Sequence, residues 1–125
     1  MTKVDVDTPT HQLEKTDKSE RTAPEACTCM EHVRDGIDRL DRVLVSVLAE
    51  RQRYIEAAAR IKPAKNEVRL EWRIEEVVAK VLAESGNQGL SKRIAEPVWR
   101  ELIEKCIEHE HIYWDLAHPG EIKKD

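Results

Sequence analysis

Arg51 and Lys62 are the residues of this sequence whose types and spacing could do chemistry. Both fall on positions of a long helical pattern where an apolar residue is expected. Eleven residues of an α-helix make three turns plus about 20°, so both cations share one face, with backbones about 16 Å apart. With Ala58 between them, the gap suits a small dicarboxylate, one anionic group for each cation. An alternative stays open, in which the side-chain stems pack while the charged ends reach solvent.

The elements that must position these cations are helices. Apolar residues recur every three and four positions over residues 29–62, and Pro63 ends that pattern. The sequence predicts a loop over residues 63–67, a second helix over 68–86 and a third over 91–116, with no strand. The first helix, about 45 Å long, is too long for one small chain to cover. We therefore expect a coiled-coil-like partner or an intertwined dimer.

The composition excludes several classes of protein. Of the 125 residues, 37% are charged and only 4% are aromatic, which favours a helical protein over a β-sandwich or barrel. A net charge of −4 argues against nucleic acid as a partner. No apolar run approaches the roughly 20 residues of a membrane span, so no membrane partner is expected.

Three further features bear on compartment and domain boundaries. The first residues carry no apolar signal segment, and an odd count of three cysteines indicates reduced thiols, so a cytoplasmic protein is expected. Residues 1–27 are polar and are predicted to form a disordered tail. A helical domain over residues 28–118 and a C-terminal tail over 119–125 complete the predicted organisation.

The cysteines and histidines do not have the spacing of a metal site. Structural zinc needs four ligands at recognisable intervals, which are missing around Cys27, Cys29, Cys106, His109 and His111. The sequence therefore predicts no metal.

Most other charges on the first helix are interpreted as solvated ion pairs. Basic and acidic residues alternate there, and several pairs lie three or four positions apart. They carry no site hypothesis and comprise Arg39, Arg42, Arg53 and Arg60 with Asp35, Asp38, Asp41, Glu50 and Glu56.

Residues 24–114 resemble the helical chorismate mutase family, most closely its isochorismate-pyruvate lyase branch. The specific part is the spacing of Arg34, Arg51 and Lys62, which is 17 and then 11 residues. The resemblance implies an all-α, three-helix chain with a long first helix, in an intertwined homodimer with two equivalent active sites and no cofactor. The matching stretches are CT at 27–28, VRDGIDRLDRVLVSVLAER at 33–51, AAARIK at 57–62, VRLEWR at 68–73, GL at 89–90 and IYW at 112–114.

The resemblance also implies a role for each matching residue. Arg34 would reach into the partner chain's site, while Arg51 and Lys62 would bind the carboxylates of a small dicarboxylate substrate. Lys62 would also approach the ether oxygen of the enolpyruvyl group, and Arg73 would supply a further cation. Glu110 stands where the family commonly has a glutamine that hydrogen-bonds this ether oxygen.

Glu110 is the first departure from the family pattern. An ionised carboxylate would repel the negative charge that develops on the ether oxygen, whereas a protonated carboxyl could donate a hydrogen bond to it. We therefore expect activity to rise as pH falls. The alternative is an exposed glutamate on a charged helix with no role.

Ile74 is the second departure, because typical mutases carry an acid there that contacts the ring hydroxyl. Glu71 could substitute from one turn earlier. The lyase branch has an aliphatic residue at this position, as this chain does.

These residues lead to a ranked set of predicted functions. The first is a chorismate mutase, which rearranges chorismate to prephenate for aromatic amino acid biosynthesis through positioning and charge stabilisation alone. The second is an isochorismate-pyruvate lyase, which forms salicylate and pyruvate. A 4-amino-4-deoxychorismate substrate comes third. A helical dimerisation module without catalysis is the alternative from another class.

Overall fold

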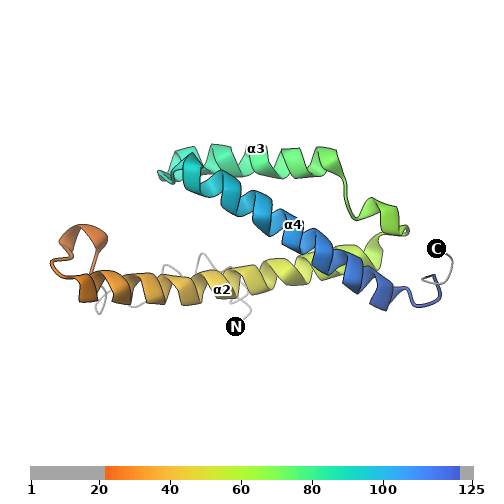
Figure 1. Ribbon diagram of the computed structural model, residues 1–125, viewed down its shortest axis with the longest axis horizontal. Coiled ribbons are helices and arrows are strands. Elements are labelled where there is room, and N and C mark those ends of the chain that lie inside the picture. The colour runs from red at the N-terminus through yellow and green to blue at the C-terminus, as the bar shows by residue number, and fades with distance from the viewer. Residues whose placement is uncertain (1–21, 122–125) are drawn as a thin grey trace, which may run out of the picture. The chain divides into compact units, whose positions relative to one another are not determined.

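The computed structural model describes residues 22–121, and all regular structure in that range is helical (Figure 1). The chain divides into two compact units, Met1–Arg51 and Gln52–Asp125, and each is considered by itself. The elements in chain order are η3 (Pro24–Ala26), α2 (Met30–Ile61), η4 (Lys65–Glu67), α3 (Glu71–Gln88) and α4 (Lys92–Ala117).

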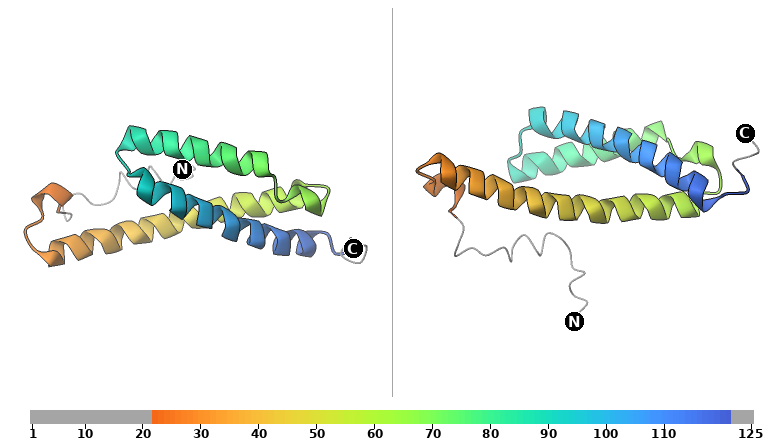
Figure 2. Two further views of the ribbon diagram at one scale, coloured as in Figure 1. Left: turned by 45° about the horizontal axis from the view of Figure 1, so that its top comes forward. Right: turned by 60° about the horizontal axis from the view of Figure 1, so that its bottom comes forward.

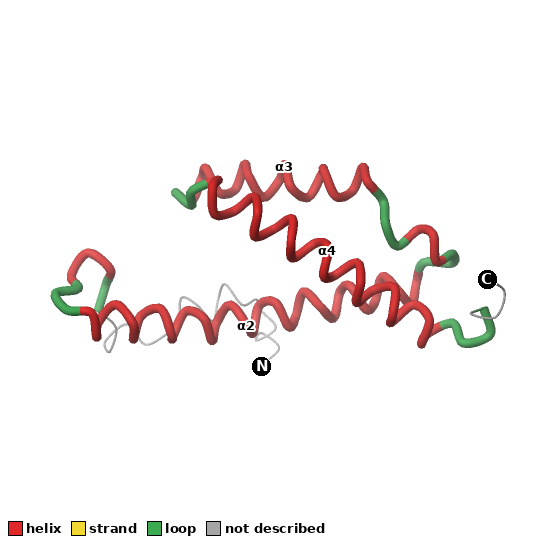
Figure 3. The backbone as a smooth tube through the Cα atoms, in the orientation of Figure 1, coloured by secondary structure: helices red, strands yellow, loops and turns green. Residues whose placement is uncertain are grey.

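The three long helices confirm the all-α prediction, and Figure 3 shows α2 as one unbroken helix. The helix α3 begins at Glu71 rather than at residue 68, since Val68 is buried at the end of η4 and does not open the helix. It also runs through Gly86 and Asn87 and ends at Gly89, whose φ of 76° is the left-handed conformation that favours glycine. The predicted start of α4 is confirmed, because the Ser91 side chain caps it by accepting a hydrogen bond from the Arg93 amide.

The first unit contains η3 and the N-terminal part of α2. Along this part of α2, large apolar side chains remain exposed at helical spacing, and they are Ile37, Leu40, Leu44 and Leu48. Residues 1–21 of the predicted polar tail, and residues 122–125 of the predicted C-terminal tail, lie outside the described residues.

The second unit contains the end of α2, η4 and a hairpin of α3 and α4, which lie side by side in the views of Figures 1 and 2. Ile74, Val78 and Ile103 form the core between α3 and α4. A second cluster joins Ala59 of α2 to Val68 and to Trp114 of α4. The second cluster packs the C-terminal half of α4 against the end of α2.

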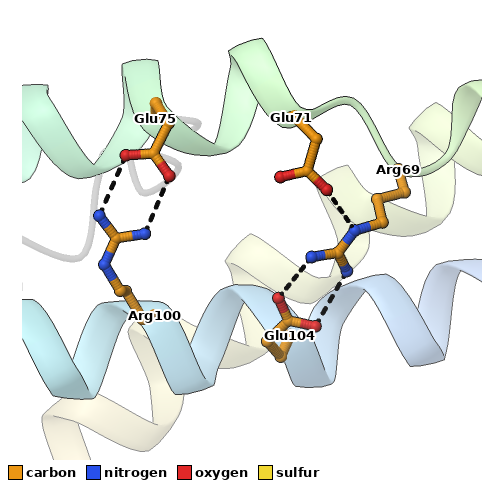
Figure 4. A network of polar contacts seen from close by, with 5 residues as sticks. All are labelled: Arg69, Glu71, Glu75, Arg100 and Glu104. Atoms are coloured by element: carbon orange, nitrogen blue, oxygen red, sulfur yellow. Dashed lines mark hydrogen bonds and ion pairs between the residues drawn. The ribbon is translucent and has the colours of Figure 1, made fainter.

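Two arginines form ion pairs that link α4 to α3 and to the residues just before α3 (Figure 4). Arg100 donates two hydrogen bonds of 3.0 Å to Glu75, and Arg69 donates two of 2.9 and 3.0 Å to Glu104. Through these bonds each guanidinium lowers the pKa of its carboxylate partner below the ordinary value. Among residues 22–121, no helix is long and apolar enough to cross a bilayer.

Candidate active site

The most buried charge contact in the second unit joins Lys62 to Glu110. The Lys62 Nζ lies 2.8 Å from the Glu110 Oε2. Glu110 is only 4% exposed, so the alternative of an exposed glutamate is wrong. A buried carboxylate beside an ammonium group costs desolvation free energy that an apolar pair would not, and buried charges of this kind are typical of functional sites.

The end of α2 holds Lys62 through its backbone. The Lys62 amide still donates to the Ala58 carbonyl at 2.9 Å, although Pro63 follows and stops the helix. The Lys62 carbonyl accepts a 3.0 Å hydrogen bond from the indole Nε1 of Trp114. The Nζ also reaches the Val68 carbonyl at 3.5 Å, so Lys62 contacts both α4 and the segment after η4.

Trp114 is a structural part of this site, although in the sequence it was named only as the last residue of the IYW stretch that carries the family resemblance. It is 3% exposed, and its ring stacks on His118 with centroids 4.1 Å apart. A buried indole N–H needs an acceptor, and that requirement was the signal that could have linked Trp114 to a nearby backbone. The distance of 52 residues from Lys62 hides the partner from sequence reasoning.

The connection between α2 and α3 is tied to the end of α4. Predicted as a loop over residues 63–67, it contains η4, which packs beside α4. The Lys65 Nζ lies 2.9 Å from the Asp115 Oδ1 and donates to the Oδ2 at 3.1 Å. A charged contact thus holds this connection against α4 at Asp115, five residues after Glu110.

Arg73 is not joined to the Lys62–Glu110 pair. Its Nη1 donates to Glu76 on the same helix at 2.8 Å, and its side chain is 53% exposed. Within the described part of the chain, it forms no hydrogen bond or ion pair with Lys62 or Glu110.

The two residues considered for hydroxyl recognition also lie elsewhere. Ile74 is buried in the core with Val78 and Ile103. Glu71 accepts a 2.7 Å hydrogen bond from Arg69 and is mostly exposed, so it is not placed as a substitute acid beside Lys62.

Arg34 and Arg51 belong to the first unit. Both lie on α2, where Arg34 is exposed and Arg51 is partly buried. Lys62 and Glu110 belong to the second unit. Within the second unit, the structure pairs two of the predicted site residues, Lys62 and Glu110.

Sequence reasoning missed a second contact between α2 and α4. Glu56, interpreted above as part of a solvated ion pair, instead lies 2.7 Å from the His109 Nε2. The Glu56 side chain is 21% exposed, and its bond to His109 lowers its pKa. No local signal could have found this pair, since its members are 53 residues apart.

The Lys62–Glu110 arrangement can offer a cation and a carboxyl group to one oxygen atom. A protonated carboxyl donates a hydrogen bond, and an ammonium stabilises developing negative charge at short range in a water-poor site. Among residues 22–121, no group of three or more His, Cys, Asp or Glu side chains could hold a metal ion.

Comparison with known proteins assigns the chain to a family. The family profile described as Chorismate mutase type II matches residues 33–111. An isochorismate pyruvate lyase from Pseudomonas aeruginosa is 28% identical over 91 residues, which are 73% of this chain and 90% of that protein. The matched region contains both members of the buried pair, and the chain belongs to the chorismate mutase type II family.

Proposed function

We propose that this protein is a chorismate mutase that rearranges chorismate to prephenate at the Lys62–Glu110 pair. The observation that supports it is a buried carboxyl 2.8 Å from a lysine ammonium in a chain of this family. Chorismate carries two carboxylates and an ether oxygen that becomes negative as its bond breaks. Lys62 supplies the positive charge, and a protonated Glu110 supplies the hydrogen bond.

The contact between Lys62 and Glu110 gives this proposal a specific pH dependence. While Glu110 is ionised, it neutralises the ammonium group that the substrate needs. Protonation of Glu110 ends that competition and turns the carboxyl into a donor. Activity therefore rises as pH falls, until loss of other ionised groups reverses the trend.

The other predicted residues complete the proposed site. Arg51 binds a substrate carboxylate with its planar guanidinium, and Arg73 leaves Glu76 to bind the substrate when the site is occupied. Because the contact between Arg73 and Glu76 is exposed, breaking it costs little free energy. Arg51→Ala should reduce kcat/KM by about 100-fold or more while leaving the helical content unchanged.

A second candidate function is that of an isochorismate-pyruvate lyase. Ile74 supports it, because a buried aliphatic residue stands where an acid would contact the ring hydroxyl of chorismate. The similarity to a protein named isochorismate pyruvate lyase supports it as well. The lyase reaction breaks the same ether bond, so the roles proposed for Lys62 and Glu110 carry over.

A paired assay separates the candidates. Purified protein receives chorismate in one series and isochorismate in the other, from pH 5 to 8, and prephenate, salicylate and pyruvate are quantified. Prephenate as the main product supports the mutase, whereas salicylate with equal pyruvate supports the lyase. A folded protein that converts neither substrate would contradict both and favour a non-catalytic helical module.

We also propose that the active form is a homodimer. The apolar stripe of α2 in the first unit is the supporting observation, with Leu44 at 55% exposure and Ile37 at 52%. A monomer would leave this stripe in water, and a second copy could cover it. Arg34, on the same helix, would then act in the partner's site.

Complementation tests the role of Arg34 across the dimer. Arg34→Ala and Lys62→Ala are each expected to be inactive. If Arg34 acts in the partner's site, a mixed dimer has one intact site, and random pairing restores about a quarter of the wild-type activity. If Arg34 acts within its own chain, co-expression of the two variants restores nothing.

A further inference from the structure

Glu56 and His109 form a second polar link between the same two helices that carry Lys62 and Glu110. The His109 Nε2 and the Glu56 Oε2 are 2.7 Å apart. Gln52 donates to the same carboxylate oxygen at 3.1 Å from one turn earlier on α2. Both members are partly buried, with side-chain exposures of 21% for Glu56 and 38% for His109.

Because the two links join the same two helices, the geometry of the Lys62–Glu110 contact depends on the contact between Glu56 and His109. His109 directly precedes Glu110, so the two side chains leave α4 about 100° apart. Glu56 lies six residues before Lys62, or about 9 Å along α2. A contact at His109 therefore fixes the rotation of α4 about its own axis, which sets the direction of Glu110.

Small rotations matter at this site. A turn of α4 by about 10° moves a carboxylate about 7 Å from the helix axis by about 1 Å. Displacements of that size can lower the rate of a reaction about 100-fold when catalysis depends on oriented charges. Trp114, which bonds the Lys62 carbonyl, limits the same motion further along α4.

The charges around His109 determine how this link responds to pH. From α2 it faces Glu56, whose pKa is lowered by the hydrogen bond to His109 and by the nearby charge of Arg53. On α4, Tyr113 stacks on the imidazole with centroids 6.2 Å apart, and Lys105, one turn earlier, pairs with Glu108. Histidine side chains in general can change charge near neutral pH. A positive charge on this imidazole would strengthen the hydrogen bond that it already makes to the Glu56 carboxylate.

We propose that Glu56 and His109 are positioning residues, which hold Lys62 and Glu110 in place for turnover and do so most tightly when His109 is protonated. This inference rests on the proposed function for its kinetic consequence. Neither residue touches the substrate. Together they make the geometry of the reacting pair depend on pH independently of the protonation of Glu110.

Kinetics of matched variants test the proposal. Glu56→Gln and His109→Gln keep side chains of similar size but remove the charge, and Glu75→Gln is the control because it weakens an exposed pair between α3 and α4. At pH 6 the first two variants should lower kcat about 10-fold, and at pH 8 about threefold, with KM changed less than twofold. Each variant's kcat is divided by the wild-type kcat at the same pH. This ratio cancels the effect of Glu110 protonation, which all of these proteins share. A ratio that does not vary with pH, or that equals the ratio for Glu75→Gln, would overturn the proposal.

A measurement without turnover separates this proposal from the proposed function. In a Glu110→Gln background, the backbone amide signals of Lys62 and residue 110 are followed by NMR from pH 6 to 8. They should shift with pH, and the shift should vanish when His109→Gln is added. A pH-dependent shift without any turnover would support the positioning role of Glu56 and His109 and contradict the proposed enzymatic function. Turnover without the shift would contradict the positioning role and leave the enzymatic function standing.

Discussion

The second unit contains two kinds of ion pair, and they differ in almost every physical respect. Arg69 with Glu104, and Arg100 with Glu75, make paired hydrogen bonds of good geometry on the surface of the α3–α4 hairpin. Lys62 and Glu110 make a single 2.8 Å contact in which the carboxylate is almost fully buried. The surface pairs have the better geometry, and the buried pair has the less solvated environment.

The difference indicates what each kind of pair is for. Surface pairs are screened by water and salt, and they fix the register of two helices at little cost. A buried pair contributes little net stability, because its attraction must first offset the desolvation of both charges. A chain selected for stability alone would place apolar side chains at these positions, so the Lys62–Glu110 pair points to a chemical role.

The largest expected effect comes from removing the buried cation. Lys62→Met should lower kcat/KM by about 1000-fold, because the charge that stabilises the breaking ether bond is lost. It should also lower the free energy of unfolding by about 3 kcal/mol, since Glu110 loses its partner. Steady-state kinetics and denaturant unfolding measure the two effects.

A double variant separates function from stability at this pair. Lys62→Met with Glu110→Leu should recover most of the lost stability and none of the activity. If the double variant were as unstable as the single one, the pair would be structural and the contrast with the surface pairs would fail.

The next effect concerns the indole that holds the Lys62 backbone. Trp114→Phe removes the donor to the Lys62 carbonyl and should cost about 1–2 kcal/mol of unfolding free energy. A severalfold loss of kcat should accompany it, because Lys62 is less well positioned. Trp72→Phe is the control, since Trp72 is 65% exposed. Equal effects of the two substitutions on kcat would remove Trp114 from the site.

The smallest effect is expected at the surface pairs. Glu75→Gln and Glu104→Gln should leave kcat/KM unchanged and lower Tm at pH 7 by about 2 °C or less, with the difference shrinking further in high salt. Because the folded-state pKa values of Glu75 and Glu104 lie below the ordinary 4.5, their contribution is present above that pH. It is lost as pH falls through the lowered values. Thermal scans from pH 3 to 7 should therefore show wild type and variants converging in acid.

The sequence allowed the helices to be predicted, because apolar periodicity and the helix-ending effect of Pro63 act locally. It also placed Lys62 and Glu110 in one site, although only through a family resemblance. Contacts between residues more than 50 positions apart could not be derived, such as the bond from Trp114 to Lys62 and the pair of Glu56 with His109. The start of α3 differs from the prediction because Val68 packs in a buried cluster with Ala59 and Trp114, so tertiary packing prevailed over local periodicity.

The pH dependence of turnover by wild type and Glu110→Gln tests the central claim most directly. If Glu110 must be protonated to act, wild-type kcat/KM should fall about 10-fold per pH unit on the alkaline limb of its profile. Glu110→Gln should remain active and lose that steep limb, since an amide donates a hydrogen bond at every pH. Superimposable profiles for the two proteins would contradict the account and leave the buried carboxyl without a part in the chemistry.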